Sequence, residues 1–149
     1  MIDWRPAIKG GDDELRTIIL GGTLVLSVLL AQQPSYAVSL CDGVDTQLTK
    51  QRKSDYAKLI AASLGSKVKP SKVRVENFMQ SGTWTVIYAD VPIADPGYFF
   101  FDASTGKPNF KDVWGGMADK SEMPDLIKWA RKLGANPKIA SCFADTATG

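Results

Sequence analysis

An uncharged apolar run, Ile18 to Ala31, divides this chain of 149 residues into a leading segment and a part that can fold. Basic residues precede the run, and Ser35-Tyr36-Ala37 follows it with small residues at the two positions that a signal peptidase reads. The run has about 14 residues, fewer than the roughly 20 that a permanent membrane-spanning helix needs. The sequence therefore predicts a signal peptide over residues 1–37 and an exported product, periplasmic or secreted. An uncleaved membrane anchor is the alternative.

Residues 38–149 remain as the folded part, a length that suits a single domain with one hydrophobic core. The composition is ordinary for a globular protein, which argues against intrinsic disorder. The formal net charge of the sequence is +2, so a strongly basic nucleic-acid-binding protein is not expected.

Both cysteines lie in this part, Cys41 near its start and Cys142 near its end. An even number of cysteines in an exported protein indicates pairing, which predicts one disulfide between them. In the chain-entropy model, a loop of about 100 residues closed in this way stabilises the folded state by about 4–5 kcal/mol. Two unrelated buried thiols are the alternative. A metal site on the pair is not expected, because the sequence contains no histidine.

The folded part opens with a helical pattern. Apolar residues between Tyr56 and Leu64 recur at three- and four-residue spacing, which predicts a helix within 46–64. Thr49 is a suitable N-cap, and Gly65 is suitably placed to end the helix. The basic residues of this stretch lie largely off the apolar stripe. The helix is therefore expected to pack its apolar stripe on a sheet and to leave the basic residues outside.

Strand patterns and turn residues follow. Val73 and Val75 alternate with charged residues, the period of a half-buried strand. Ser81-Gly82 predicts a hairpin turn, and the proline-rich stretch 90–97 is expected to interrupt the pairing. The expected strands are one opened by Pro70, then Thr83–Ala89, Tyr98–Asp102 and a short edge strand Phe110–Trp114.

A second helical pattern starts at Ser121 or Met123 and stops at Gly134. Asn136-Pro137 then predicts only a short last turn that carries Cys142 back towards the start. Hairpin strands with helices before and after them are typical of α+β architecture. The predicted fold is therefore an N-terminal helix packed on a three- to four-stranded antiparallel sheet, followed by a C-terminal helix.

Four pieces of the chain together resemble a PepSY-type domain, which has a cystatin-like arrangement of one helix against an antiparallel sheet. These pieces are the helix Tyr56–Leu64, Val73-Arg74-Val75, Gly82–Val86 and the aromatic strand with its Thr-Gly turn, Tyr98–Lys107. The resemblance implies a core over about 49–114 and a helical extension over 115–143. The longer insert 90–97 and the helix after Trp114 depart from it. The family is associated with binding or inhibiting peptidases and with cell-envelope roles, and it brings no catalytic residues.

The sequence lacks the residues that most catalytic mechanisms require. Without histidine, Ser-His and Cys-His nucleophile systems cannot be built. Ser104 and Lys107 share a turn, with no helix start to hold them as a dyad. No glycine-rich phosphate loop follows a strand. We expect no cofactor and no metal ion.

Two groups of carboxylates remain as candidates. Asp90, Asp95 and Asp102 lie near strand ends, where a carboxylate pair could act as in glycosidases. Acids are also common in turns, because they accept hydrogen bonds from neighbouring amides. The second group comprises Asp119, Glu122 and Asp125. Their spacing fits acidic residues near a helix N-terminus better than the ligands of a calcium-binding loop.

Charge marks one candidate partner surface. Between Thr46 and Glu76, eight basic residues stand against two acidic ones, while the rest of the folded part is net negative. A basic face containing Lys50 and Lys53 could therefore meet an anionic partner such as an acidic protein, a wall polymer or lipid headgroups. An ordinary solvated helix face is the alternative.

Aromatic residues mark a second candidate surface. Phe99 and Phe101 form an apolar partner surface if the second helix leaves one sheet face uncovered. Trp114 and Met117 flank the Gly115-Gly116 joint and suit a binding edge. The alternatives are that the second helix covers the sheet and that Trp114 plugs the core.

These observations favour a non-enzymatic exported binding protein that inhibits or sequesters another protein, such as a peptidase or a cell-wall-directed toxin. One alternative is a structural or sensory envelope module that binds an anionic wall or membrane partner. Another is a carboxylate-dependent hydrolase of cell-wall glycans.

Overall fold

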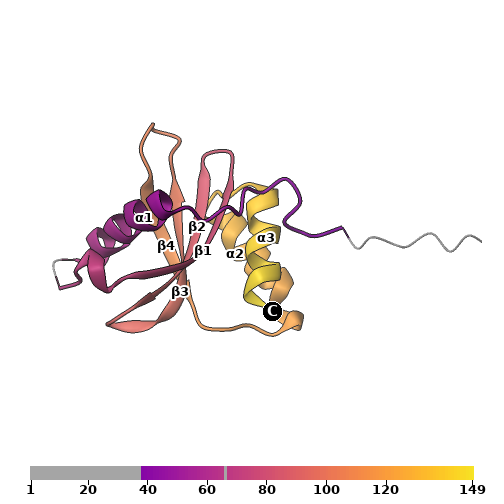
Figure 1. The fold of residues 1–149 in the computed structure, drawn as a ribbon. Helices are drawn as coiled ribbons and strands as arrows, with labels where there is room; N and C mark the ends of the chain where they lie inside the picture. Colours follow the sequence, from indigo (N-terminus) through magenta and orange to yellow (C-terminus); the bar gives the residue numbers. More distant parts are fainter. Residues whose placement is uncertain (1–37, 66) are drawn as a thin grey trace, which may run out of the picture. The chain divides into compact units, whose positions relative to one another are not determined.

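The computed structural model describes residues 38–65 and 67–149, so the predicted signal peptide lies outside the described residues. One helix precedes a four-stranded antiparallel sheet of order β1-β2-β3-β4, and two helices follow it (Figure 1). The predicted α+β fold is therefore confirmed. The elements are α1 (Lys50–Ser63), η1 (Pro70–Lys72), β1 (Arg74–Ser81), β2 (Trp84–Val91), β3 (Ala94–Asp102), β4 (Asn109–Gly115), η2 (Lys120–Glu122), α2 (Met123–Lys132) and α3 (Pro137–Ala147). None of the helices in the described ranges has the length and apolarity to cross a membrane.

The ends of α1 follow from two residues. The Thr49 hydroxyl accepts a hydrogen bond from the amide of Arg52 at 3.2 Å, which fixes the N-terminus at Lys50. After the helix, Gly65 has a φ of +86°, a conformation that glycine adopts without steric cost. The predicted cap and stop are both confirmed.

The sheet has an apolar side chain on each face at most positions, so it carries two separate core clusters. On the α1 side, Ile60 packs with strand residues such as Ile87 and Phe99; we call this the α1-side cluster. On the opposite face, Val86 and Phe100 pack under α2 and α3 in the α3-side cluster. Figure 1 shows α1 and the pair α2–α3 on opposite sides of the sheet. Successive residues of β2 alternate between the two clusters, with Val86 on the α3 side and Ile87 on the α1 side.

The last helix corrects the prediction of a short final turn. Asn136 accepts a hydrogen bond from the amide of Ile139 at 3.0 Å, and Pro137 occupies the first helical turn, where its missing N–H costs nothing. Both residues start a helix here, and α3 continues to Ala147 because Phe143 and the alanines of one face are buried on the sheet. The second sheet face is therefore covered mainly by α3, while Trp129 of α2 is only partly buried.

The proline-rich stretch 90–97 corrects a second expectation. It does not interrupt the sheet: β2 runs to Val91 and β3 starts at Ala94, so the turn contains only Pro92 and Ile93. Pro96 lies within β3 opposite a register shift between Ala89 and Val91. A proline cannot donate to a strand ladder, and an irregularity is where a sheet tolerates one.

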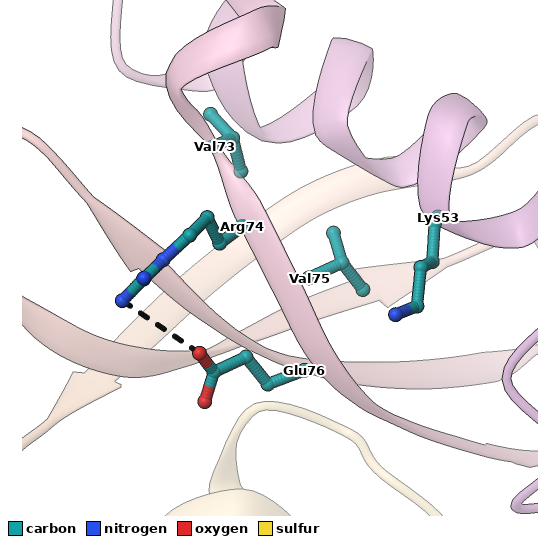
Figure 2. Close-up of a pocket in the computed structure, with 5 residues that line it drawn as sticks. All are labelled: Lys53, Val73, Arg74, Val75 and Glu76. Atoms are coloured by element: carbon teal, nitrogen blue, oxygen red, sulfur yellow. Dashed lines mark ion pairs between the residues drawn. The ribbon is translucent and has the colours of Figure 1, made fainter.

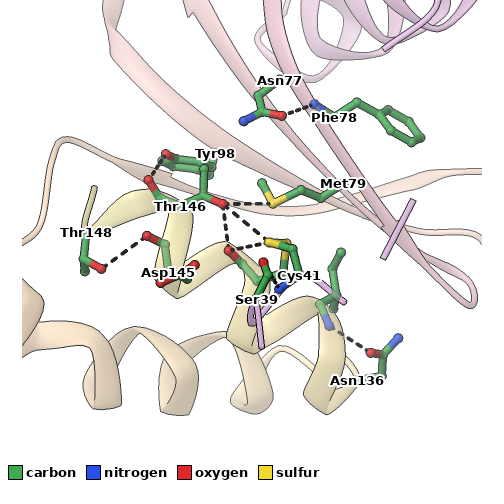
Figure 3. Close-up of a disulfide and its surroundings, with 12 residues drawn as sticks. Ser39, Cys41, Asn77, Phe78, Met79, Tyr98, Asn136, Asp145, Thr146 and Thr148 are labelled. Atoms are coloured by element: carbon green, nitrogen blue, oxygen red, sulfur yellow. Dashed lines mark hydrogen bonds between the residues drawn. A yellow bond between two sulfur atoms is a disulfide. The ribbon is translucent and has the colours of Figure 1, made fainter. Parts of the chain in front are cut away.

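A disulfide joins the two ends of the described fold, as predicted. The sulfurs of Cys41 and Cys142 are 1.97 Å apart, and Figure 3 shows this disulfide with its surroundings. Cys142 belongs to α3 and is buried in the α3-side cluster. The segment that follows Cys41 runs beside β1, where the backbone of Asp45 pairs with Gln80 in both directions at 2.8 and 2.9 Å. The disulfide thus holds a strap, residues 41–49, across the outer edge of β1.

In each of the two outer strands, a side-chain oxygen accepts a hydrogen bond from the backbone amide of the following residue. The amide of Phe78 in β1 donates to Asn77 Oδ1, and the amide of Val113 in β4 donates to Asp112 Oδ1, both at 2.8 Å. Each strand also has a register shift next to this residue. A side chain therefore occupies a backbone donor on each strand, which makes these edges poor templates for pairing with another chain.

Tyr98 gives a pH-dependent prediction. Its buried hydroxyl donates to the carbonyl oxygen of Thr146 at 3.3 Å, and burial raises the pKa of Tyr98 to about 12. The folded state therefore holds this proton more tightly than the unfolded state, whose tyrosine pKa is about 10. The stabilisation is complete below pH 10 and is lost as pH rises towards 12. An absorbance titration is expected to show ionisation near pH 12 that Tyr98→Phe removes. A normal tyrosine titration at this residue would contradict its burial.

Candidate functional site

A groove runs beside α1, where the helix faces η1 and the start of β1. It consists of three hollows of about 520, 400 and 310 Å³. The first two share Lys53 and Val73, and the last two share Lys58 and Pro70, so the hollows follow one another along the helix. We call this feature the basic groove and define it by Lys50, Lys53 and Lys58 on the helix wall and Pro70, Val73 and Val75 on the opposite wall.

The two walls come together because the chain reverses at Gly65. After this turn, η1 and β1 run back along α1, so Val73 and Val75 face the first half of the helix. Figure 2 shows Lys53 reaching from α1 towards β1, across from Val75. Both valines are buried in the α1-side cluster, so the surface that the groove offers to a ligand is mainly its charged rim.

The three lysines of the helix wall are exposed, and none of them takes part in an ion pair within the described ranges. The arginines nearby are paired. Arg74 lies 2.5 Å from Asp90 and 3.8 Å from Glu76, the second contact being drawn in Figure 2. The groove therefore presents ammonium groups whose charge no carboxylate of the described fold neutralises at contact distance.

Arg52, in the same turn of the helix, differs from these lysines because its charge is paired within the fold. Its guanidinium lies 2.6 Å from Asp45 and stacks 4.1 Å from the ring centre of Phe78. The hydrogen bond from Arg52 holds the pKa of Asp45 below its usual value. Arg52 is thus fixed against the strap, whereas Lys50 and Lys53 on the same turn point into the groove without such a partner.

The first turn of α1 is electrostatically unfavourable. It contains Lys50, Arg52 and Lys53 and no acidic residue. The positive end of a helix dipole disfavours cations by about 0.3–1 kcal/mol each, and like charges three or four residues apart repel by about 0.2–0.5 kcal/mol. Lys50 and Lys53 therefore lower the stability of the helix that carries them.

No protein-family model, curated protein or solved structure matches this chain. The resemblance to PepSY-type domains accordingly stays a prediction, and the site is interpreted from its own geometry.

Phe99 and Phe101 do not form a partner surface. They are 2% and 1% exposed and lie in the α1-side cluster, where Phe101 packs against Tyr56 and both contact Phe110. The expectation that they mark an apolar patch is corrected, because the helix and the outer strand cover them. Exposed apolar area appears instead on β4, at Phe110 and Val113.

The structure separates Trp114 from Met117. The Trp114 ring is half-buried and packs against Tyr98 and Phe143, so it fills the α3-side cluster from the sheet edge. Met117 is 76% exposed beyond the end of β4. Lys50 and Lys53 are the two partner-binding candidates that the fold brings into one hollow.

Among the candidate acids of the sheet, Asp102 lies too far from Asp90 to form a catalytic pair with it. Asp90 bonds Arg74, and Asp95 lies exposed near the turn at the same end of the sheet. Asp102 pairs with Trp84 in the register, six residues along β2 from Asp90, which is about 20 Å at the rise of a strand. A glycosidase pair needs about 5–10 Å. Asp102 instead accepts the Ser104 hydroxyl at 2.7 Å, which holds its pKa below the usual value.

The remaining polar candidates have structural contacts. Because its hydroxyl bonds Asp102, Ser104 is engaged within the turn. Asp119 and Glu122 form a reciprocal capping box at the start of η2, which confirms the helix N-terminus interpretation. Across 38–65 and 67–149, no group of three or more potential ligands could hold a metal ion.

Sequence reasoning found Lys50 and Lys53 but missed the wall that faces them. The sequence pattern assigns Val73 and Val75 to a half-buried strand and does not show that this strand lies along the helix. The signal that could have joined them is the glycine stop at Gly65 with few residues before Pro70, because such a short connection returns the chain alongside the helix.

Proposed function

We propose that this protein is an exported, non-enzymatic binding protein whose basic groove holds an anionic partner. The disulfide supports export, because such bonds persist in oxidising compartments and are rare in the cytosol. The signal-peptide pattern of the sequence points the same way. That binding inhibits or sequesters the partner stays a prediction from the resemblance.

The observation that carries this proposal is the presence of Lys50 and Lys53 at the positive end of α1. They lower stability there, and no acid of the described residues offsets them at contact distance. Rules of local stability are most often broken at functional sites, where a residue serves binding rather than folding. An anion in the groove would remove both the repulsion between the lysines and their conflict with the helix dipole.

Charge reversal is expected to separate binding from folding. The Lys50→Glu/Lys53→Glu variant places two acids in the first turn of α1, so its free energy of unfolding should rise by about 0.5–2 kcal/mol. Its binding to anionic material of the native envelope fraction should fall about tenfold or more, since two attractions become repulsions. Urea unfolding and an immobilised-protein binding assay measure the two effects.

The matched control is Lys128→Glu/Lys132→Glu on α2. Both lysines are exposed, they lie across the sheet from the groove, and the change in net charge is the same. This control should bind as the unaltered protein does. Binding should also weaken as salt screens the charges. An equal loss of binding in both double variants, or binding that does not change with salt concentration, would contradict a role for the basic groove.

A further inference from the structure

We propose that the anionic partner of the basic groove is the surface of a membrane that contains anionic lipids, and that the tip of the β2–β3 hairpin inserts into it beside the lysines. This inference rests on the proposed function and narrows it from an anionic partner to one class. It follows from the apolar side chains of the tip, from its position at the same end of the sheet as η1, and from the kind of cations at that end.

The tip of the β2–β3 hairpin, residues 92–94, is exposed and carries no polar side chain. Pro92, Ile93 and Ala94 are consecutive exposed residues, and Ile93 is 55% exposed and belongs to neither core cluster. Two-residue hairpin turns are usually made by asparagine, aspartate or glycine. A run of exposed apolar residues is unfavourable in water unless it serves a function. The fold itself gives Ile93 no packing role, so its side chain suits a partner that accepts hydrocarbon.

The register of the sheet places this tip at the same end as η1. Arg74 at the start of β1 pairs with Asp90 near the end of β2. Lys72 comes two residues before Arg74, and Ile93 comes three residues after Asp90, so their Cα atoms lie within about 8 and 11 Å of those residues. Figure 1 shows the turn between β2 and β3 at the end of the sheet where α1 also ends. An apolar tip and a group of cations therefore share one end of the fold.

The cations at this end form an open array of lysines. Lys53 and Lys58 of α1 line a hollow with Pro70, while Lys69 precedes η1 and Lys72 ends it. All four lysines are exposed, and none of them forms an ion pair with a residue of 38–65 or 67–149. Because the valines below are buried, the ammonium groups do not enclose a ligand but face outwards. Exposed lysines in such an array are attracted to the surface of anionic lipid membranes.

The acids near the tip differ in how far they offset this charge. Arg74 lies 2.5 Å from Asp90 and 3.8 Å from Glu76, so these two carboxylates are engaged within the fold. Asp95 is exposed beside the tip. Its negative charge opposes contact with an anionic surface, so removing it should strengthen binding.

The side-chain types favour a membrane over a protein or a soluble polyanion. Protein interfaces are enriched in arginine and aromatic residues and are depleted in lysine. At this end, Arg74 is engaged by carboxylates, the cations of the array are lysines, and the tip has no aromatic residue. A soluble polyanion would satisfy the lysines but would leave Ile93 in water. A lipid surface satisfies both, because headgroups meet the ammonium groups while the headgroup–acyl boundary takes up an apolar side chain.

Cosedimentation of the purified, oxidised protein with phosphatidylglycerol vesicles tests this inference. The protein should bind these vesicles, more weakly as salt rises, and should not bind phosphatidylcholine vesicles. Lys69→Glu/Lys72→Glu should weaken binding about tenfold or more, since two attractions become repulsions. Ile93→Ser should weaken it about five- to tenfold, because the apolar insertion is lost. Asp95→Asn should strengthen it about two- to fivefold.

The matched control for Ile93→Ser is Leu40→Ser. Leu40 is 44% exposed and adjoins Cys41, which packs against the α3-side cluster, so it lies away from the lysine array. This variant should bind phosphatidylglycerol vesicles as the unaltered protein does. An equal loss of binding in both serine variants would show that the tip has no special role and would overturn the inference.

The remaining outcomes separate this inference from the proposed function. Equal binding of phosphatidylcholine vesicles would indicate unspecific apolar contact and would overturn it. Binding of phosphatidylglycerol vesicles that Ile93→Ser leaves unchanged would also overturn it, because charge alone would then be sufficient. If the vesicles do not bind but anionic envelope material does so through Lys50 and Lys53, the membrane inference falls and the proposed function stands. If neither binds, both proposals fall.

Discussion

Cys41→Ser is expected to lower the free energy of unfolding by about 2–5 kcal/mol. The disulfide spans 101 residues of sequence, and opening it releases a long loop in the unfolded chain, so the unfolded state gains most of the entropy. The folded state also loses the anchor of the strap that covers β1 (Figure 3). Urea unfolding of the oxidised protein and of the variant measures the difference.

The unaltered protein under reducing conditions is the control for this measurement. It should unfold at the same urea concentration as Cys41→Ser, because both lack the same bond and keep Cys142 in the core. A reduced protein that is as stable as the oxidised one would show that the bond does not form or does not constrain the chain. If Cys41→Ser were much less stable than the reduced protein, the extra loss of stability would come from the serine side chain and not from the missing bond.

Phe143→Ala is expected to cost about 3–5 kcal/mol of unfolding free energy. Its ring is fully buried in α3, with ring centres at 4.9 Å from Phe100 and 5.1 Å from Tyr98. The two tryptophans at the border of the α3-side cluster also pack on it, at 5.9 and 6.0 Å. Truncation leaves a cavity at the point where α3, the sheet and α2 meet, and these elements cannot all close around it.

Phe110→Ala is the matched control, because it removes the same atoms from a side chain that is 39% exposed on β4. Its cost should be clearly smaller, since less apolar surface returns to water and no closed cavity forms. Thermal or urea unfolding of both variants gives the comparison. Similar costs at the two positions would contradict the placement of α3 as the main cover of the second sheet face.

Local signals were sufficient for most of the fold. Thr49, Gly65 and Gly134 set helix ends by their own backbone and side-chain chemistry, and the alternation at Val73 and Val75 marked a half-buried strand. These features need no tertiary contact to be recognised. The same holds for the pairing of the two cysteines.

The errors arose where tertiary packing decides between two local options. Asn136-Pro137 starts either a turn or a helix, and the burial of Phe143 on the sheet selects the helix. Prolines at 92 and 96 favour a break, yet the turn and the register shift accommodate both within a hairpin. Phe99 and Phe101 appeared available because the sequence does not show how far α1 and β4 extend over them.

For a related reason, the sequence predicted the lysines of the candidate site but not the strand that faces them. A cluster of lysines is apparent in any sequence, but a groove needs two walls. Only the return of residues 68–76 along α1 shows that Lys53 and Val75 belong to one surface.

The division of the core between two sheet faces also orders the events of synthesis. The α1-side cluster draws its buried residues from between Ala57 and Phe101, so all of them are present once β3 has been made, and only the cover by Phe110 of β4 is still to follow. The opposite face has no cover until α2 and α3 follow, and the residues from Asp102 to Ala147 take about 2–9 s to add at about 5–20 residues per second. During that interval Trp84, Val86 and Phe100 have no native partner above them. A nascent chain of this protein therefore offers a chaperone a defined apolar surface for a defined time, and the second cysteine of the bond arrives only near the end of it.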